Sequence, residues 1–73
     1  MVDYMQKVGA AIHSVRKEQR LSITEVHFRT RIAHQAIRKI ERGEVYPRLD
    51  TLLNICQALE VKPSRLFVMV DGL

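Results

Sequence analysis

The sequence predicts an all-α protein, and three observations support this prediction. Apolar residues recur every three or four positions along nearly the whole chain, which is the spacing of helices with one buried face. Asp3 with Gln6 and Ser22 with Glu25 have the spacing of a capping box, a common start of a helix. The 73 residues include only three glycines and two prolines. We therefore expect one compact domain of five short helices.

The first three helices follow from capping and apolar spacing. The first is expected to begin at Asp3 and end near Arg20, with an inner face of Val8, Ile12 and Val15. The second begins at Ser22 and carries a short stripe, namely Ile23, Val26 and Thr30. The chain breaks near Arg31, and a third helix from about Ala33 to Arg42 buries Ile32, Ala36, Ile37 and Ile40.

Glycine and proline mark the boundaries of the last two helices. Gly43 ends the third helix, and a turn stiffened by Pro47 follows. The fourth helix carries the strongest apolar stripe, which is Leu49, Leu52, Leu53, Cys56 and Leu59. Pro63 suits the first position of a fifth helix that directs Leu66 and Phe67 inward. Residues 68–73 are expected to form an apolar tail.

The charge of the chain is uneven. Lys and Arg number 12 against 8 Asp and Glu, a net charge of +4. Residues 1–43 hold nine of the bases and four of the acids, whereas the remainder holds three bases and four acids. This distribution favours a polyanion partner for the first part and a protein partner for the apolar second part.

Composition also excludes several classes of protein. The lone Cys56 rules out a disulfide scaffold and a Cys-based zinc finger, and it fits a reducing compartment. No apolar run exceeds five residues, and the first residues lack a secretory signal, so we expect a soluble cytoplasmic protein. His13, His27 and His34 lack ligand spacing. We therefore expect no metal, no cofactor and no enzymatic activity.

The most specific motif is Lys39-Ile40-Glu41-Arg42-Gly43, followed by Pro47, Leu49 and Thr51-Leu52-Leu53. Together with Gly9, Arg16 and the apolar positions between Val8 and Phe67, this motif resembles the Cro/CI-type (XRE-like) helix-turn-helix domain of phage repressors and bacterial transcriptional regulators. The resemblance implies a compact five-helix, lambda-repressor-like DNA-binding domain with a central helix-turn-helix. It also implies a sequence-specific repressor or autoregulator that binds a pseudo-palindromic operator in a bacterial or phage-infected cell and is nucleoid-associated when bound.

The expected DNA-contacting residues lie on and around the third helix. Its outward side chains are rich in hydrogen-bond donors, and the resemblance implies that its first turn contacts bases, which predicts contacts from Ala33, His34, Gln35, Arg38 and Lys39. Phosphate or minor-groove contacts are expected from Ser22, Arg42, Tyr46 and Arg48. The alternative for both sets is an ordinary solvated surface. The resemblance further implies that Glu41 turns inward and forms a structural ion pair with Arg16.

Three departures from the family pattern lie in the helix-turn-helix itself. Ile23 replaces a phosphate-binding Gln, His27 replaces an Ala at a close helix contact, and Arg31 replaces a Gly of positive φ. Gly is also replaced by Arg20 and Glu60 at two other helix ends. Either the turn is strained but intact, or the two helices meet at an altered angle. We expect replacement of His27 by Ala together with Arg31 by Gly to raise the melting temperature.

A homodimer is expected, because the end of the chain is rich in apolar residues. The predicted interface comprises Ile55, Phe67, Val68, Met69 and Val70, and the alternative is that these residues cover the domain's own core. Three other functions fit the sequence. These are an antitoxin with a toxin as its partner, a restriction-modification controller protein, and a protein-interaction module of the same fold that has lost DNA binding and contacts another regulator.

Overall fold

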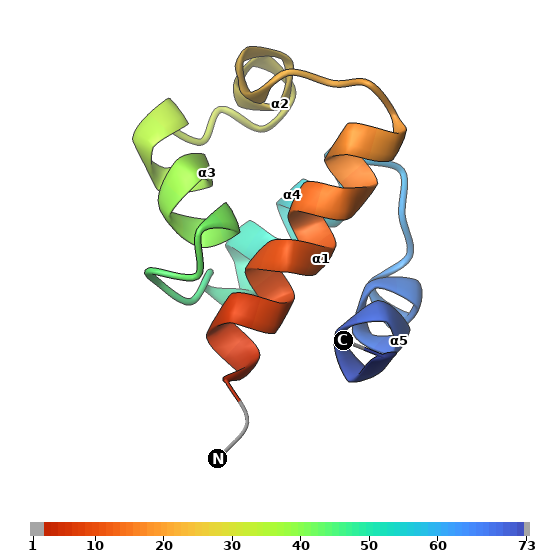
Figure 1. Cartoon of the computed structure of the whole chain (residues 1–73). Coiled ribbons are helices and arrows are strands. Elements are labelled where there is room, and N and C mark those ends of the chain that lie inside the picture. Colours follow the sequence, from red (N-terminus) through yellow and green to blue (C-terminus); the bar gives the residue numbers. More distant parts are fainter. Residues whose placement is uncertain (1–2, 73) are drawn as a thin grey trace.

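The computed structural model describes residues 3–72, and these residues form five helices and no strands. The helices are α1 (Tyr4–Glu18), α2 (Ile23–Thr30), α3 (His34–Glu41), α4 (Leu49–Ala58) and α5 (Pro63–Gly72). In Figure 1, α1 runs through the middle of the molecule between α3 and α5, while α2 lies across one end and packs on α3 and α4. The all-α fold with five helices is confirmed. No helix in the described part of the chain is long and apolar enough to span a membrane.

Local sequence determines where the first two helices begin. The Asp3 carboxylate accepts a hydrogen bond of 3.1 Å from the Gln6 backbone N–H. At α2 the capping box is complete, because the Ser22 hydroxyl accepts from the Glu25 N–H and the Glu25 carboxylate accepts from the Ser22 N–H, each at 3.0 Å. The hydrogen bonds from Ser22 lower the pKa of Glu25. In contrast, Ala33 at the start of α3 provides no side-chain cap.

A single core joins all five helices. The buried apolar side chains lie at the predicted spacing in α1, α2 and α3, and the core comprises Val8, Ala11, Ile12, Val15, Val26, Ile37, Ile40, Leu52, Ile55, Cys56, Leu59, Leu66 and Val70. Ile23 and Ile32 pack against this core while partly exposed. The inner faces predicted for the first three helices are therefore largely correct.

The predicted inner face of α4 was wrong in part. Leu49 is 69% exposed and Leu53 is also exposed, whereas Ile55 is only 1% exposed. Two apolar stripes overlap on this helix, and packing against α2 and α5 buries the one that contains Leu52, Ile55, Cys56 and Leu59. Periodicity alone does not choose between two such stripes.

The end of the chain also differs from the prediction. Residues 68–72 continue α5 as helix and do not form a tail, and Leu73 lies outside the described residues, as do Met1 and Val2. Leu66 and Val70, four residues apart, face the core, and Phe67 is exposed. The expectation that Phe67 points inward was therefore wrong.

Gly9 permits the close approach of α1 and α3. A Cβ atom at this position would overlap the Ile40 carbonyl oxygen and lie 2.8 Å from that of Glu41. Only a residue without a side chain allows this backbone-to-backbone contact. The middle of α1 thereby lies directly against the end of α3 that carries Glu41.

Three helix ends adopt left-handed backbone conformations without glycine. Arg20 has φ 58°, Arg31 has φ 66° and Glu60 has φ 53°. The strain expected at Arg31 is thus present, because a side chain in this conformation costs about 1–2 kcal/mol. The turn is nonetheless intact, since the Arg31 N–H donates to the His27 carbonyl at 2.7 Å and Asn54 donates to the Thr30 carbonyl at 3.0 Å.

We predict that Arg31→Gly stabilises the protein by about 1 kcal/mol, because glycine adopts the observed φ without steric cost. In a domain of this size, such a gain raises the melting temperature by about 4–8 °C. Thermal unfolding followed by circular dichroism measures the change. The matched control is Ala10→Gly, at an exposed position in the middle of α1, which should lower the melting temperature, since glycine is unfavourable in a helix interior. A decrease for Arg31→Gly would contradict the strain at this turn.

Candidate nucleic-acid interface

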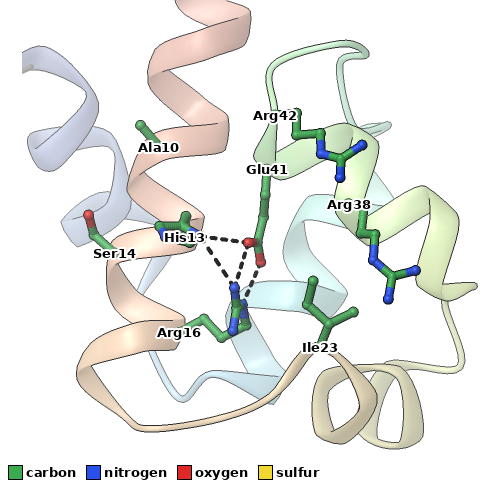
Figure 2. Close-up of a pocket in the computed structure, with 8 residues that line it drawn as sticks. All are labelled: Ala10, His13, Ser14, Arg16, Ile23, Arg38, Glu41 and Arg42. Atoms are coloured by element: carbon green, nitrogen blue, oxygen red, sulfur yellow. Dashed lines mark hydrogen bonds and ion pairs between the residues drawn. The ribbon is translucent and has the colours of Figure 1, made fainter.

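A buried ion pair joins α1 to α3 behind the candidate interface. Arg16 Nε donates to Glu41 Oε2 at 2.8 Å and Arg16 Nη2 donates to Glu41 Oε1 at 2.9 Å, a two-point contact of guanidinium and carboxylate. Arg16 Nη1 donates to the Leu21 carbonyl at 2.8 Å. The Glu41 side chain is only 6% exposed. The predicted pairing of these two residues is therefore present in the structure (Figure 2).

His13 completes this cluster and was not predicted as part of it. Its Nδ1–H donates to Glu41 Oε1 at 2.9 Å. Arg16 Nη2 lies 3.3 Å from the same nitrogen, which cannot accept a hydrogen bond while it donates to Glu41. The sequence contained a sign of this contact, because residues three apart share a helix face and His13 precedes Arg16 by three positions.

The cluster keeps both members of the ion pair charged. Burial alone would raise the pKa of Glu41, but the hydrogen bonds from Arg16 and His13 outweigh burial and lower it. The hydrogen bond to Glu41 likewise raises the pKa of Arg16, against the opposing effect of desolvation. The negative charge of Glu41 is thus neutralised inside the protein and is not presented to an anionic partner.

The outward face of α3 is consequently basic. Gln35, Arg38 and Lys39 are exposed on it, and Ala33 is exposed just before the helix. Arg38 and Arg42 border a hollow between α1, α3 and the start of α2, together with Ala10, His13, Ser14, Arg16, Ile23 and Glu41 (Figure 2). Four of the five predicted base-contacting residues are thus exposed, and three of them, Gln35, Arg38 and Lys39, share one side of α3.

His34, the fifth predicted base-contacting residue, is less exposed than the other four, and its side chain contacts another helix. Its side chain is half-buried against α2, where Nε2 lies 3.2 Å from the Thr24 hydroxyl and its ring stacks on that of His27. His27 in turn donates from Nδ1 to the Ile32 carbonyl at 2.6 Å. His27 thus makes favourable contacts at the helix junction. Because His27→Ala would remove these contacts, the structure no longer supports the expectation that this replacement helps to raise the melting temperature.

Of the four residues predicted to contact phosphates, two arginines already form ion pairs and Ser22 already accepts a capping hydrogen bond. Arg42 lies 3.9 Å from Glu44, and Arg48 lies 3.3 Å from Asp50, in ion pairs that are well exposed. Such exposed pairs are weak and easily exchanged for another anion. Tyr46 is exposed. The Ser22 oxygen accepts the capping bond at α2, which leaves its hydroxyl hydrogen for a phosphate.

Only some of the residues in the predicted dimer interface are exposed. Ile55 and Val70 belong to the core, so these two assignments were wrong, and Met69 is partly buried against the core. Phe67 and Val68 remain exposed on α5, with Val68 70% exposed. Leu49 and Leu53, which were predicted to be buried, form an exposed apolar pair one helical turn apart on α4.

The fold and the basic outward face of α3 define a helix-turn-helix protein. The helix-turn-helix family model matches residues 12–66, which is most of the chain. The chain therefore belongs to this family of DNA-binding regulators. No group of three or more His, Cys, Asp or Glu side chains within residues 3–72 could hold a metal ion.

Several solved structures share this fold. ClgR, the clp gene regulator from Corynebacterium glutamicum, superimposes with a TM-score of 0.91 at 22% identity, covering 94% of this chain and 88% of ClgR. The restriction-modification controller protein C.Esp1396I, solved as a tetramer with its natural 35-base-pair operator, gives 0.88 at 22% identity over 99% of this chain and 95% of its own. C.AhdI, the controller protein from Aeromonas hydrophila, gives 0.83 at 25% identity over 86% and 96%. No curated protein matches the chain significantly.

We predict that Arg16→Ala destabilises the protein by about 3–5 kcal/mol, because it leaves the Glu41 carboxylate buried without its partner. Urea unfolding at pH 7 measures the loss. Replacing both residues, Arg16→Met with Glu41→Leu, should recover most of the stability, since no buried charge remains. A melting temperature within a degree or two of wild type for Arg16→Ala would contradict the buried pair.

The same pair should produce a defined pH dependence. Because the pKa of Glu41 is lower in the folded protein than in the unfolded chain, its contribution is complete above the ordinary Glu range and declines as the pH falls through the lowered pKa. The stability difference between wild type and Glu41→Gln should therefore shrink in acid. An equal difference at every pH would show that the charge of Glu41 does not contribute.

Proposed function

We propose that this protein recognises a specific double-stranded DNA sequence by placing α3 in the major groove, and that it regulates transcription from there as a repressor or autoregulator. One observation carries the proposal. The exposed side chains of α3 include Gln35, Arg38 and Lys39, whereas its one acidic residue, Glu41, is buried and paired. This face therefore offers hydrogen-bond donors and positive charge without an opposing exposed carboxylate.

The chemistry of these side chains matches base edges. The amide of Gln35 can donate to N7 and accept from N6 of adenine, and Arg38 or Lys39 can donate to O6 and N7 of guanine. Ala33, exposed directly before α3, offers a methyl group to a thymine methyl. These residues give the first two turns of α3 the means to distinguish one sequence from another.

The surrounding basic residues are suited to phosphates. Arg42 and Arg48 take part only in exposed ion pairs, which a phosphate can replace at little cost. The hollow between α1 and α3 has Arg38 and Arg42 at its border and the partly exposed Ser14 beside them. Contacts of this kind hold a protein in register on the duplex without reading its sequence.

We further propose a homodimer that brings two copies of α3 to half-sites about 34 Å apart. Leu49 and Leu53 on α4 and Phe67 and Val68 on α5 are exposed apolar residues on two helices that contact each other. Lone exposed apolar residues are common, but several on adjoining helices favour a protein contact. A second copy of this chain is the partner that a pseudo-palindromic operator requires.

A restriction-modification controller is the second candidate function. The observation in its favour is that two of the solved structures with this fold, C.Esp1396I and C.AhdI, are controllers and are covered almost completely by this chain. Both candidates require the same DNA contacts and differ only in the gene that the operator controls. Selection of bound sequences from a random DNA pool, followed by location of the operator, distinguishes them.

We predict specific, salt-dependent binding of the selected operator. The logarithm of the affinity should fall linearly with the logarithm of salt concentration, with a slope near −0.9 for each phosphate neutralised. Gln35→Ala should weaken operator binding by about 1–3 kcal/mol and relax the base preference at one position. Fluorescence anisotropy with operator and altered duplexes measures both effects. Gln57→Ala, which removes an exposed glutamine from α4, is the matched control and should bind as wild type does.

Two results would contradict this proposal. Equal weakening by Gln35→Ala on every duplex would show that Gln35 reads no base. An absence of binding to any duplex at low salt would instead favour a protein-interaction module of the same fold.

We predict that Leu53→Lys with Val68→Lys converts a dimer into a folded monomer, because both side chains are exposed and their replacement removes apolar contact area and adds like charges. Sedimentation velocity at high micromolar concentration measures the association, and thermal unfolding verifies the fold. The matched control is Phe28→Lys, which replaces an exposed apolar residue of α2 and should leave the dimer unchanged. A wild-type protein that sediments as a monomer would overturn the dimer.

A further inference from the structure

Two residues of α2, Thr24 and His27, hold the side chain that opens α3. His34 is the first residue of α3, and the residue before it, Ala33, provides no side-chain cap. Nε2 of His34 lies 3.2 Å from the Thr24 hydroxyl. The rings of His27 and His34 stack with centroids 4.2 Å apart and planes inclined by 29°. His34 is therefore fixed from two sides by side chains of another helix.

His27 is itself anchored to the turn. Its Nδ1–H donates to the Ile32 carbonyl at 2.6 Å, and the Ile32 N–H donates to the Thr30 hydroxyl at 3.1 Å. The Thr30 hydroxyl in turn donates to the Val26 carbonyl at 2.8 Å, inside the core. A continuous set of hydrogen bonds thus connects the buried part of α2 to the ring that supports His34.

This arrangement leaves one nitrogen of His34 for a further partner. A neutral imidazole has one donor and one acceptor nitrogen, and the contact with Thr24 engages Nε2. Nδ1 has no hydrogen-bond partner within residues 3–72. The next residue, Gln35, is exposed on the face that we propose to contact DNA. A ring already held in one orientation loses little conformational entropy when a base edge bonds to it.

We propose that Thr24 and His27 are positioning residues that orient His34 toward a base edge and thereby determine the sequence preference of the first turn of α3. The inference rests on the proposed DNA-binding function and adds two residues of α2 to the residues that control specificity. It also explains why a histidine at the close contact of α2 and α3 is compatible with an intact helix-turn-helix.

The test begins with the base preferences of wild type and His34→Ala, obtained by selection from a random DNA pool and by competition with singly altered operators. His34→Ala should relax one or two operator positions. Thr24→Val and His27→Ala should relax the same positions and no others, each by about two- to tenfold, which corresponds to the loss of one hydrogen bond. The salt dependence of binding should remain that of wild type, since no phosphate contact changes.

Conservative replacements separate positioning from a general structural role. Thr24→Ser retains the hydroxyl and should keep the wild-type preference, and His27→Phe retains a ring against His34 and should restore most of what His27→Ala loses. Thr51→Val is the matched control, because it removes a threonine hydroxyl from α4 without touching this network. Thermal unfolding of each variant shows how much of any effect follows stability.

The outcomes are distinct. Unchanged preferences in Thr24→Val and His27→Ala, or an equal loss at all operator positions that follows the loss of stability, would overturn the inference. An unchanged profile for His34→Ala would overturn it as well, while operator binding by wild type and its dependence on Gln35 would still support the proposed function. If wild type binds no duplex, the proposed function fails, and this inference fails with it.

Discussion

The structure depends on the buried contact between Arg16 and Glu41. A buried ion pair adds little net stability, because desolvation of both charges offsets their attraction, but the loss of one partner leaves an uncompensated buried charge. Here Gly9 allows the backbones of α1 and α3 to approach closely, and the two-point contact joins the same two helices through their side chains. The same contact withdraws the only acid of α3 from the surface. One interaction therefore both connects α3 to α1 and removes a negative charge from the outward face.

The junction of α2 and α3 shows how a sequence can depart from its family pattern and keep the fold. Arg31 adopts the left-handed conformation that glycine would adopt freely, at a steric cost that the closed turn absorbs. His27 occupies a close helix contact without disrupting it, because its ring finds an acceptor in Ile32 and a stacking partner in His34. The departure at His27 is thus accommodated by its contact with His34, which a comparison of single positions with the family pattern cannot show.

In α4 and α5, the residues that are buried and those that are exposed differ from the ones expected. Burial of Ile55 and Val70 removes them from any interface, and exposure of Leu49 and Leu53 supplies other apolar residues in the same region. We therefore still propose self-association, but through a different set of exposed residues, which are Leu49, Leu53, Phe67 and Val68. It now uses one face of α4 and the exposed side of α5, both of which lie on helices that do not carry the outward face of α3.

The sequence by itself determined the five helices, the capping residues of the first two and the helix-turn-helix, and its resemblance to a family implied the pairing of Arg16 with Glu41, since these depend on local spacing or on a specific motif. Only the tertiary structure decided which of two overlapping stripes on α4 is buried, that His13 joins the ion pair, and that Thr24 and His27 hold His34. The physical reason is that periodicity specifies a face of a helix only to within about one residue position, whereas burial and hydrogen bonding depend on the neighbouring helices. Contacts between residues on different helices, such as those of His27 and His34, exist only once the core has placed these helices together.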